Sequence, residues 1–158
     1  RYIDAMRPAI EDGTVQYTGI DPDSSALEVL QQASSRCVTF QTKIEDFEMD
    51  PEAWDHILIL QSWNHIFDPR RALQKCLGGL RSNGTVLIAD NVAFGLLRSR
   101  KQKIRAEAGP AEFEHWRNDR GKDVDTLLND LKVEVIMSRD VTAQTSNQWI
   151  RQVQAKKS

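Results

Sequence analysis

A carboxylate and an imidazole stand at the ends of two strand-like runs in this 158-residue sequence. The first run, Val15 to Asp21, is short, β-branched and aromatic, and it ends in Gly-Ile-Asp followed by a proline. A carboxylate at the carboxyl edge of a strand can accept hydrogen bonds from the two vicinal hydroxyl groups of a ribose, as it does in doubly wound nucleotide-binding folds. Aspartate also starts turns frequently, so a turn role for Asp21 is the alternative.

The imidazole is that of His65, a few residues beyond the second run, Trp54 to Leu60. Folds that alternate helices and strands place their ligands at the carboxyl ends of strands. Imidazole titrates near neutral pH, so His65 is a candidate general base. A structural histidine, packed under the loop that follows the strand, is the alternative.

The elements that must position these residues alternate between helical and strand patterns, which is typical of an α/β fold. The near-continuous apolar end of residues 54–60 favours a strand that helices cover on both faces. A short polar turn region joins the last two strands, so these are predicted to be antiparallel. The spacing predicts helices over 2–10, 25–33, 69–80 and 124–131, and strands over 15–21, 37–40, 54–60, 85–90, 133–139 and 148–153.

Two helix starts carry a capping signal. Asp68 is a predicted N-cap, and Pro69 follows at the first helical position, where a missing N–H has no cost. Ser25, with Glu28 three residues on, has the form of a capping box. Both signals predict a helix N-terminus a few residues beyond a strand.

The composition argues against several classes of protein. A net charge of -2 argues against a nucleic acid as the main partner, because phosphate neutralisation requires a basic surplus. No apolar run approaches the ~18 residues of a membrane span, and nothing resembles a signal peptide. Cys37 and Cys76 lack metal-ligand spacing and are interpreted as reduced, buried thiols of a cytoplasmic protein. The composition leaves the oligomeric state open.

Together these pieces resemble the class I S-adenosylmethionine-dependent methyltransferases. The resemblance extends from residue 1 to about residue 90, and more loosely through the last strand pair; its strongest part is WDHILILQSWNHIFDPRRALQKCLGGLRSNGTVLIAD. It implies one Rossmann-like domain over residues 1–158, with a doubly wound, mostly parallel sheet and an antiparallel C-terminal strand pair. It also implies S-adenosyl-L-methionine as the cofactor, with Asp21 at its ribose.

The resemblance assigns further cofactor contacts. Asp46 and Phe47 fall where the family recognises adenine, through a carboxylate or backbone amide and an apolar side chain against the ring. Glu45 is the alternative to Asp46 in another register, and a plain loop acid with a core phenylalanine is the alternative to the pair. Gln61 and Ser62 follow the third strand, where the family's backbone lines the methionine part of the cofactor.

The acceptor side of the site is implied more loosely. Transfer from a sulfonium is already activated, so in-line positioning can replace the base that His65 would provide. His115, in FEHWRND, matches a position near the family's substrate; an exposed loop residue is the alternative. Residues 91–120 lose regular periodicity and are predicted to cap the acceptor pocket. The basic run at 98–105 within them could receive an anion but is more commonly a solvated helix face.

One departure from the family is large. The glycine-rich turn and the central strand that precede the first helix are absent from the sequence, and we expect it to be a fragment. The strands at 15–21 and 54–60 would flank the missing strand and lie parallel, roughly 9.6 Å apart, which is twice the spacing of neighbouring strands.

The sequence therefore favours methyl transfer from S-adenosylmethionine to a small or medium-sized acceptor, an activity of the EC 2.1.1 class. A catalytically inactive methyltransferase-like domain with a binding or scaffold role is the alternative, because the glycine-rich turn is absent. A nicotinamide-dependent dehydrogenase would also place an acid at Asp21. The antiparallel terminal pair and the Asp-Pro helix start after the third strand argue against it.

Overall fold

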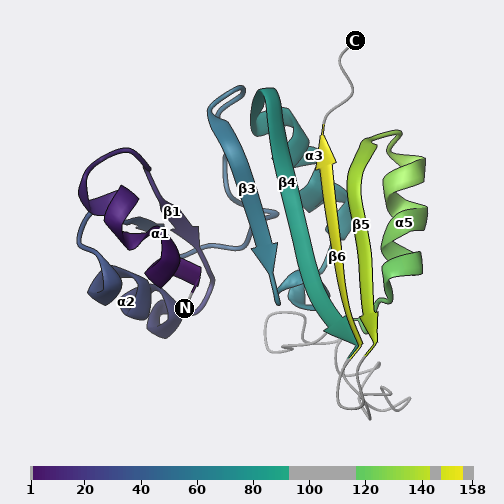
Figure 1. The fold of residues 1–158 in the computed structure, drawn as a ribbon, viewed down its shortest axis with the longest axis horizontal. Coiled ribbons are helices and arrows are strands. Elements are labelled where there is room, and N and C mark those ends of the chain that lie inside the picture. The colour runs from purple at the N-terminus through teal and green to yellow at the C-terminus, as the bar shows by residue number, and fades with distance from the viewer. Residues whose placement is uncertain (1, 93–116, 143–146, 155–158) are drawn as a thin grey trace. The chain divides into compact units, whose positions relative to one another are not determined.

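The computed structural model describes residues 2–92, 117–142 and 147–154. The chain divides into two compact units, one up to Glu48 and the other from Met49 (Figure 1). Each unit contains helices and strands of its own.

The first unit contains two helices and two short parallel strands. Its elements are α1 (Tyr2–Glu11), β1 (Thr18–Ile20), α2 (Ser24–Ala33) and β2 (Val38–Phe40). β1 and β2 pair in the register Thr18↔Val38, Gly19↔Thr39 and Ile20↔Phe40. The carboxyl ends of the two strands, Ile20 and Phe40, therefore lie side by side.

The core of the first unit is small and lies between its helices and strands. Ile3, Ile10 and Cys37 are buried there, and Met6, Val15, Tyr17, Leu30 and Ala33 pack against them. A Cβ at Gly19 would lie 2.2 Å from Leu30 Cδ2, so a larger residue there would force the Leu30 side chain to move. The glycine of the Gly-Ile-Asp run thus lets β1 approach α2 closely.

The second unit is built on a mixed four-stranded sheet with the strand order β3-β4-β6-β5. β3 and β4 are parallel, whereas β6 is antiparallel to both β4 and β5. The strands are β3 (Trp54–Leu60), β4 (Leu80–Val92), β5 (Glu134–Thr142) and β6 (Asn147–Gln154). The helices are the 3₁₀ turn η1 (Trp63–His65), α3 (Pro69–Gly79) and α5 (Gly121–Asp130).

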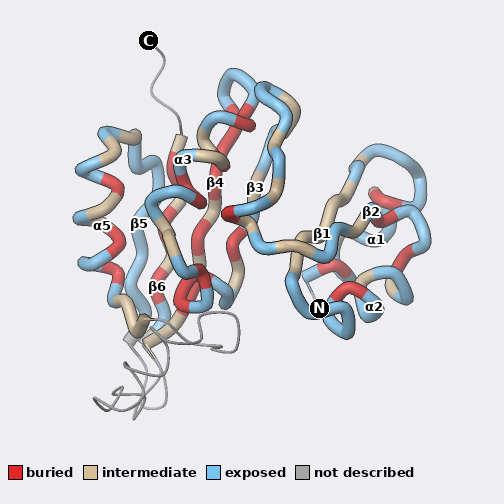
Figure 2. The backbone as a smooth tube through the Cα atoms, turned by 180° about the vertical axis from the view of Figure 1, so that it is seen from behind, coloured by how far each residue is buried: buried red, intermediate tan, exposed pale blue. Residues whose placement is uncertain are grey.

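Helices α3 and α5 bury their apolar sides in the core of the second unit (Figure 2). The buried strand residues alternate along β4 and β6, as a sheet covered on one face requires. The buried residues are Ala72, Leu73 and Cys76 of α3, Val124 and Leu128 of α5, Val86 and Ile88 of β4, and Trp149 and Val153 of β6. None of the helices in the described residues is long and apolar enough to cross a membrane.

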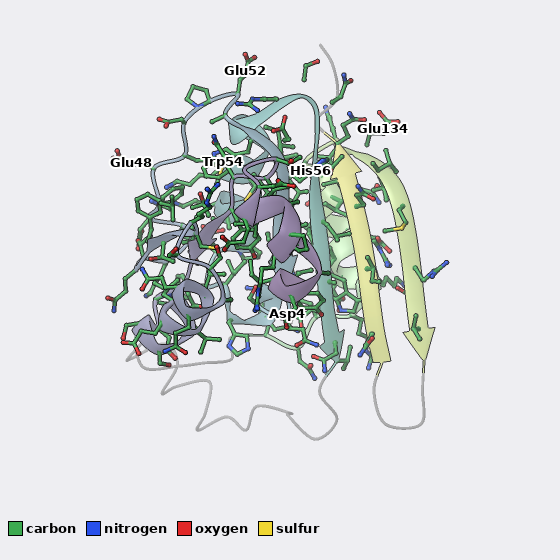
Figure 3. All side chains as sticks on the ribbon, turned by 60° about the vertical axis from the view of Figure 1, so that its left-hand side comes forward. Asp4, Glu48, Glu52, Trp54, His56 and Glu134 are labelled. Atoms are coloured by element: carbon green, nitrogen blue, oxygen red, sulfur yellow. The ribbon has the colours of Figure 1, made fainter. Side chains whose placement is uncertain are left out.

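The opposite side of β3 and β4 carries a histidine, His56. The exposed His56 of β3 lies with its Nδ1 3.1 Å from Oγ1 of Thr85, its parallel partner on β4 (Figure 3). Gln152 of β6 donates to the same hydroxyl at 3.2 Å. This contact joins three neighbouring strands.

The two predicted helix caps have different outcomes. Asp68 caps α3 as expected, with its Oδ1 accepting from Arg71 N at 3.0 Å. The capping box at Ser25 is wrong, since the N-cap of α2 is Asp23. Asp23 Oδ1 accepts from both the backbone N and the Oγ of Ser25, at 2.9 and 2.8 Å. The carboxylate of Asp23 starts the helix earlier, and Ser25 becomes a donor inside its first turn.

Strand β4 extends beyond its predicted bounds at both ends. It begins at Leu80, directly after α3, and it runs through Val92. The Asn83-Gly84 pair lies within it, because a register shift between Trp54 and His56 absorbs the extra residues. The first two residues of the segment predicted to be irregular at 91–120, Asn91 and Val92, therefore belong to β4. β1 and β3 belong to separate sheets, and the roughly 9.6 Å spacing expected between them stays a prediction.

Candidate functional site

The residues predicted to bind the cofactor fall into two groups, one in each unit. Both groups lie at the carboxyl ends of parallel strands, where α/β folds bind their ligands. The Asp21 group of the first unit comprises Asp21, Phe40, Asp46 and Phe47. The loop after β3, residues Gln61 to Phe67, carries the other predicted contacts in the second unit.

Asp21 follows β1 directly and takes part in a turn. Its backbone N donates to Phe40 O at 3.3 Å, and its Oδ1 accepts from Asp23 N at 2.8 Å. The turn interpretation is therefore correct for one carboxylate oxygen. Oδ2 accepts no hydrogen bond from the described residues, and the side chain is half-buried. One oxygen fixes the turn into α2, and the other is available to a ligand.

An aromatic pair lies beside Asp21. The rings of Phe40 and Phe47 have their centroids 5.1 Å apart and are tilted by 55°. Phe40 is opposite Ile20 in the strand register, one residue from Asp21, and its side chain is 42% exposed. Sequence reasoning selected Phe47 but treated Phe40 as part of a strand. The available signal was its place at the last position of β2, at the same edge as Asp21.

A tight turn sets the orientation of Phe47. The carbonyl of Lys43 accepts from the backbone N of both Asp46 and Phe47, at 3.0 and 2.9 Å. Asp46 is exposed, whereas Glu45 is buried. The sequence left Glu45 as the alternative to Asp46. Of these two acids, Asp46 is thus the one that a ligand can reach.

The chain turns sharply where β3 ends. Gln61 N donates to Ala89 O of β4 at 2.7 Å, and Gln61 adopts a φ of 54°. A non-glycine residue in this left-handed region is strained and persists where its surroundings hold it. The side chains of Gln61 and Ser62 are both exposed.

His65 is the last residue of η1 and is exposed, not packed beneath the loop. Its backbone N donates to Ser62 O at 3.0 Å. The residues before it, Trp63 and Asn64, are fully buried. The loop thus presents His65 outwards, and its role as a base stays a prediction.

A buried polar network anchors this loop, and sequence reasoning missed it. The Asn64 network comprises Trp63, Asn64, Asp90, Arg117, Asp119 and Trp149. At its centre, Asn64 N donates to Asp90 Oδ2 at 3.0 Å and Asn64 Nδ2 to Asn91 O at 3.2 Å. Asn64 Oδ1 accepts from Asp119 N at 2.9 Å. The amide of Asn64 therefore joins the loop to the end of β4 and to the segment before α5.

Asp119 connects the two buried tryptophans of the network. Its Oδ2 accepts from Trp63 Nε1 at 2.9 Å and from Arg117 Nε at 2.8 Å. Its carbonyl accepts from Trp149 Nε1 at 2.9 Å, and the two indole rings meet edge to face at 6.3 Å. Trp149 fills the core. These side chains keep the loop and β6 in contact.

The acceptor side of the predicted site falls largely outside the described residues. His115 and the basic run at 98–105 belong to that part of the chain, as does most of the predicted cap at 91–120. Within the described ranges, His, Cys, Asp and Glu side chains form no group that could hold a metal ion.

Comparison with known families places this geometry in context. Residues 1–86 match the model of a protein family described as "Methyltransferase domain". A search of curated protein sequences found no match.

Solved structures share the fold at low sequence identity. Phosphoethanolamine N-methyltransferase 2 of Haemonchus contortus, in complex with S-adenosyl-L-methionine, gives a TM-score of 0.68 at 11% identity, over 96% of this chain and 46% of that one. A SAM-dependent methyltransferase of Methanosarcina mazei gives 0.62 at 14% identity, over 89% and 82% of the two chains. The cyclase SpnF gives 0.67 at 14% identity, over 96% and 69%. The chain thus spans about half the length of the nematode enzyme.

Proposed function

Since this chain belongs to the methyltransferase domain family and has an α/β methyltransferase-like fold with a mixed sheet, we propose that it transfers a methyl group from S-adenosyl-L-methionine to a small or medium-sized acceptor. The observation that carries the proposal is the Asp21 group. A carboxylate oxygen that accepts no hydrogen bond from the described residues lies one strand position from an aromatic pair, at the carboxyl ends of two parallel strands.

The Asp21 group has the chemistry that an adenosine requires. The Oδ2 atom of Asp21 would accept from the ribose hydroxyls, because its charge strengthens such bonds. The rings of Phe40 and Phe47 would contact the adenine, since aromatic side chains offer an apolar face to a flat heterocycle. The exposed carboxylate of Asp46 would accept from the exocyclic amine.

The loop after β3 would receive the methionine end. The backbone is strained at Gln61, and the side chains of Gln61 and Ser62 are both exposed. The bound cofactor supplies an activated methyl group, so the residues of this chain have to bind and orient two reactants in line. His65, exposed at the end of η1, would take a proton from an acceptor that has one to lose.

Several finer points belong to the same proposal. The segment 91–120 would cap the acceptor, with His115 facing it, within a single methyltransferase domain that has no nucleic acid as its main partner. A cytoplasmic location is supported by the two free thiols, because disulfides are rare there. In the described part of the chain, β1 pairs with β2 alone and β3 with β4 alone. We expect a further strand from outside this numbering to complete them, since buried backbone groups require partners.

A small acceptor is consistent with one structural neighbour, which is a phosphoethanolamine N-methyltransferase. Another neighbour, SpnF, is a cyclase on a similar fold, which shows that this fold serves other chemistry as well. An inactive methyltransferase-like domain that binds a nucleoside or a partner protein is therefore the second candidate. It predicts S-adenosylhomocysteine binding without turnover of any small-molecule acceptor.

Calorimetric titration with S-adenosylmethionine and S-adenosylhomocysteine tests the proposal. We expect Asp21→Ala to weaken binding by about 1.5–3 kcal/mol through the loss of charge-assisted hydrogen bonds. Asp12→Ala is the matched control. In a similar turn after α1, away from the carboxyl ends of the strands, Asp12 Oδ1 accepts a hydrogen bond from Thr14 N at 2.8 Å. Equal affinities for wild type and Asp21→Ala would remove Asp21 from the site, and no binding by the wild type would refute the proposed function.

A further inference from the structure

The side chain of Arg117 binds the backbone of the loop after β3. Its guanidinium donates to the carbonyl oxygens of Trp63 at 2.9 Å, Ile66 at 2.6 Å and Phe67 at 3.4 Å. Its Cζ atom lies 5.7 Å from the centre of the Trp63 ring, and its backbone N donates to Asn64 O at 3.3 Å. One arginine, distant in sequence, thus binds four consecutive or nearly consecutive residues of the loop.

The loop needs such a partner because η1 is too short to satisfy its own backbone. The turn contains two internal backbone bonds, His65 N to Ser62 O and Ile66 N to Trp63 O. The last carbonyls of a helical turn have no partners within it, and an arginine side chain can supply the missing donors. The strained Gln61 immediately before the turn also requires a fixed surrounding.

Asp119 holds the arginine in place. Its Oδ2 accepts from Arg117 Nε, and the two side chains are 22% and 20% exposed. The same oxygen accepts from Trp63 Nε1, so one carboxylate fixes both the arginine and the indole on which it stacks. A planar guanidinium with a fixed fork of donors suits this arrangement, and a lysine cannot reproduce it.

We propose that Arg117 and Asp119 are positioning residues that hold the backbone of Gln61 to Ile66 in the conformation that receives the methionine end of the cofactor. This inference rests on the proposed function of the same site. The two residues act through Trp63 and the loop carbonyls, without touching the cofactor. Their loss should therefore weaken ligands that carry the amino-acid end and leave the binding of adenosine unchanged.

Calorimetry on the full chain with two ligands separates this role from general destabilisation. For Arg117→Ala we expect affinity for S-adenosylhomocysteine to fall about tenfold, from the loss of several hydrogen bonds that order the loop. The affinity for adenosine, which lacks the amino-acid end, should remain that of the wild type. Arg117→Lys should recover little of the loss, because a point charge replaces three directed donors.

Two further variants complete the test. Arg70→Ala is the matched control in the same unit: Arg70 pairs with Asp130 at 2.8 Å on the surface, and its loss should change neither affinity. Asp119→Asn retains an acceptor for Trp63 Nε1 and removes the charge that holds Arg117. It is the variant to measure if Arg117→Ala does not fold. We expect about threefold to fivefold weaker S-adenosylhomocysteine binding for it, with unchanged adenosine binding.

The outcomes are distinct. If Arg117→Ala and Asp119→Asn weaken both ligands equally, or neither, the positioning role is wrong while the proposed function stands. If the wild type binds neither ligand, the proposed function fails, and the positioning role fails with it.

Discussion

The Asp21 group and the Asn64 network occupy equivalent places at strand ends but differ in what satisfies their polar atoms. Asp21 uses one carboxylate oxygen for a turn, and its neighbours Phe40 and Asp46 are exposed. Asn64 is fully buried, and its backbone and side chain bond to four other residues. The first group has a hydrogen-bond acceptor left for a ligand, whereas the polar atoms of the second group bond to neighbouring residues and hold a loop in place. Side chains should therefore dominate recognition in the first unit and backbone in the second.

The largest effect on the free energy of unfolding should come from a substitution in the Asn64 network. Asn64→Ala should lower the free energy of unfolding by about 3 kcal/mol, since Asp119 N and Asn91 O lose their partners in a dry interior. Urea denaturation followed by tryptophan fluorescence measures this, because Trp63 and Trp149 both contact the network.

Asn129→Ala is the control for that experiment. Asn129 is exposed on α5, and we expect its loss to cost about 0.5 kcal/mol or less. A similarly small change for Asn64→Ala would mean that the network is not required for stability, and the contrast between the two groups would disappear.

The sequence predicts the two groups unequally for a physical reason. Asp21 was found because it ends a predicted strand, so chain order places it at the sheet edge, whereas Asp46 and Phe47 were assigned through the resemblance to a family. The bond from Trp63 to Asp119 spans 56 residues, and the bond from Asn64 Nδ2 to Asn91 spans 27. No local pattern encodes such pairs, and the contacts of Arg117 were accordingly missed.

The errors in local structure have a similar origin. Asp23 replaced Ser25 as the cap of α2 because two good capping residues lie two positions apart, and packing decides between them. The strand predicted at 85–90 begins at Leu80 instead, because tertiary pairing with β3 carries β4 through the Asn83-Gly84 pair. The strand predicted at 54–60 was correct, and the strand predicted at 37–40 begins one residue later, at Val38.

Each unit contains one cysteine, and the two thiols differ in how deeply they are buried. Burial raises the pKa of the Cys76 thiol from its ordinary 9.0 to about 12, and burial raises that of Cys37 as well. As the pH rises above 9 the unfolded chain loses the Cys76 proton first, so the stabilisation is complete below pH 9 and is lost towards pH 12. At pH 11 the loss should reach about 3 kcal/mol.

Urea titrations at pH 8 and pH 11 measure this loss for the wild type and for Cys76→Ala. The alanine variant should be less stable at pH 8 through lost packing, with a smaller decrease between the two pH values. Cys37→Ala is the matched control and should keep the decrease due to Cys76. An unchanged decrease in Cys76→Ala would assign the alkaline destabilisation to other groups.

A smaller effect separates the two roles of Asp21. Asp21→Asn keeps an oxygen that can accept from Asp23 N, and it removes the negative charge offered to the ribose. We expect S-adenosylhomocysteine and adenosine to bind about 1–1.5 kcal/mol more weakly, because hydrogen bonds to a neutral acceptor are weaker. Asp12→Asn, at the similar turn after α1, is the control. Wild-type affinity in Asp21→Asn would leave Asp21 with its turn role alone.

The smallest predicted effect concerns Phe40, the member of the Asp21 group that sequence reasoning overlooked. Phe40→Leu keeps an apolar side chain and removes the ring, so we expect adenosine to bind about 1 kcal/mol more weakly, at the lower end of base stacking on an aromatic residue. The free energy of unfolding should hardly change, because the ring is 42% exposed. Val38→Ala is the matched control: Val38 begins the same strand, is 52% exposed and lies at the opposite end from Asp21. Since adenosine and S-adenosylhomocysteine share the adenine, both must lose the same affinity in Phe40→Leu, unlike in Arg117→Ala. A loss limited to S-adenosylhomocysteine would place the adenine elsewhere.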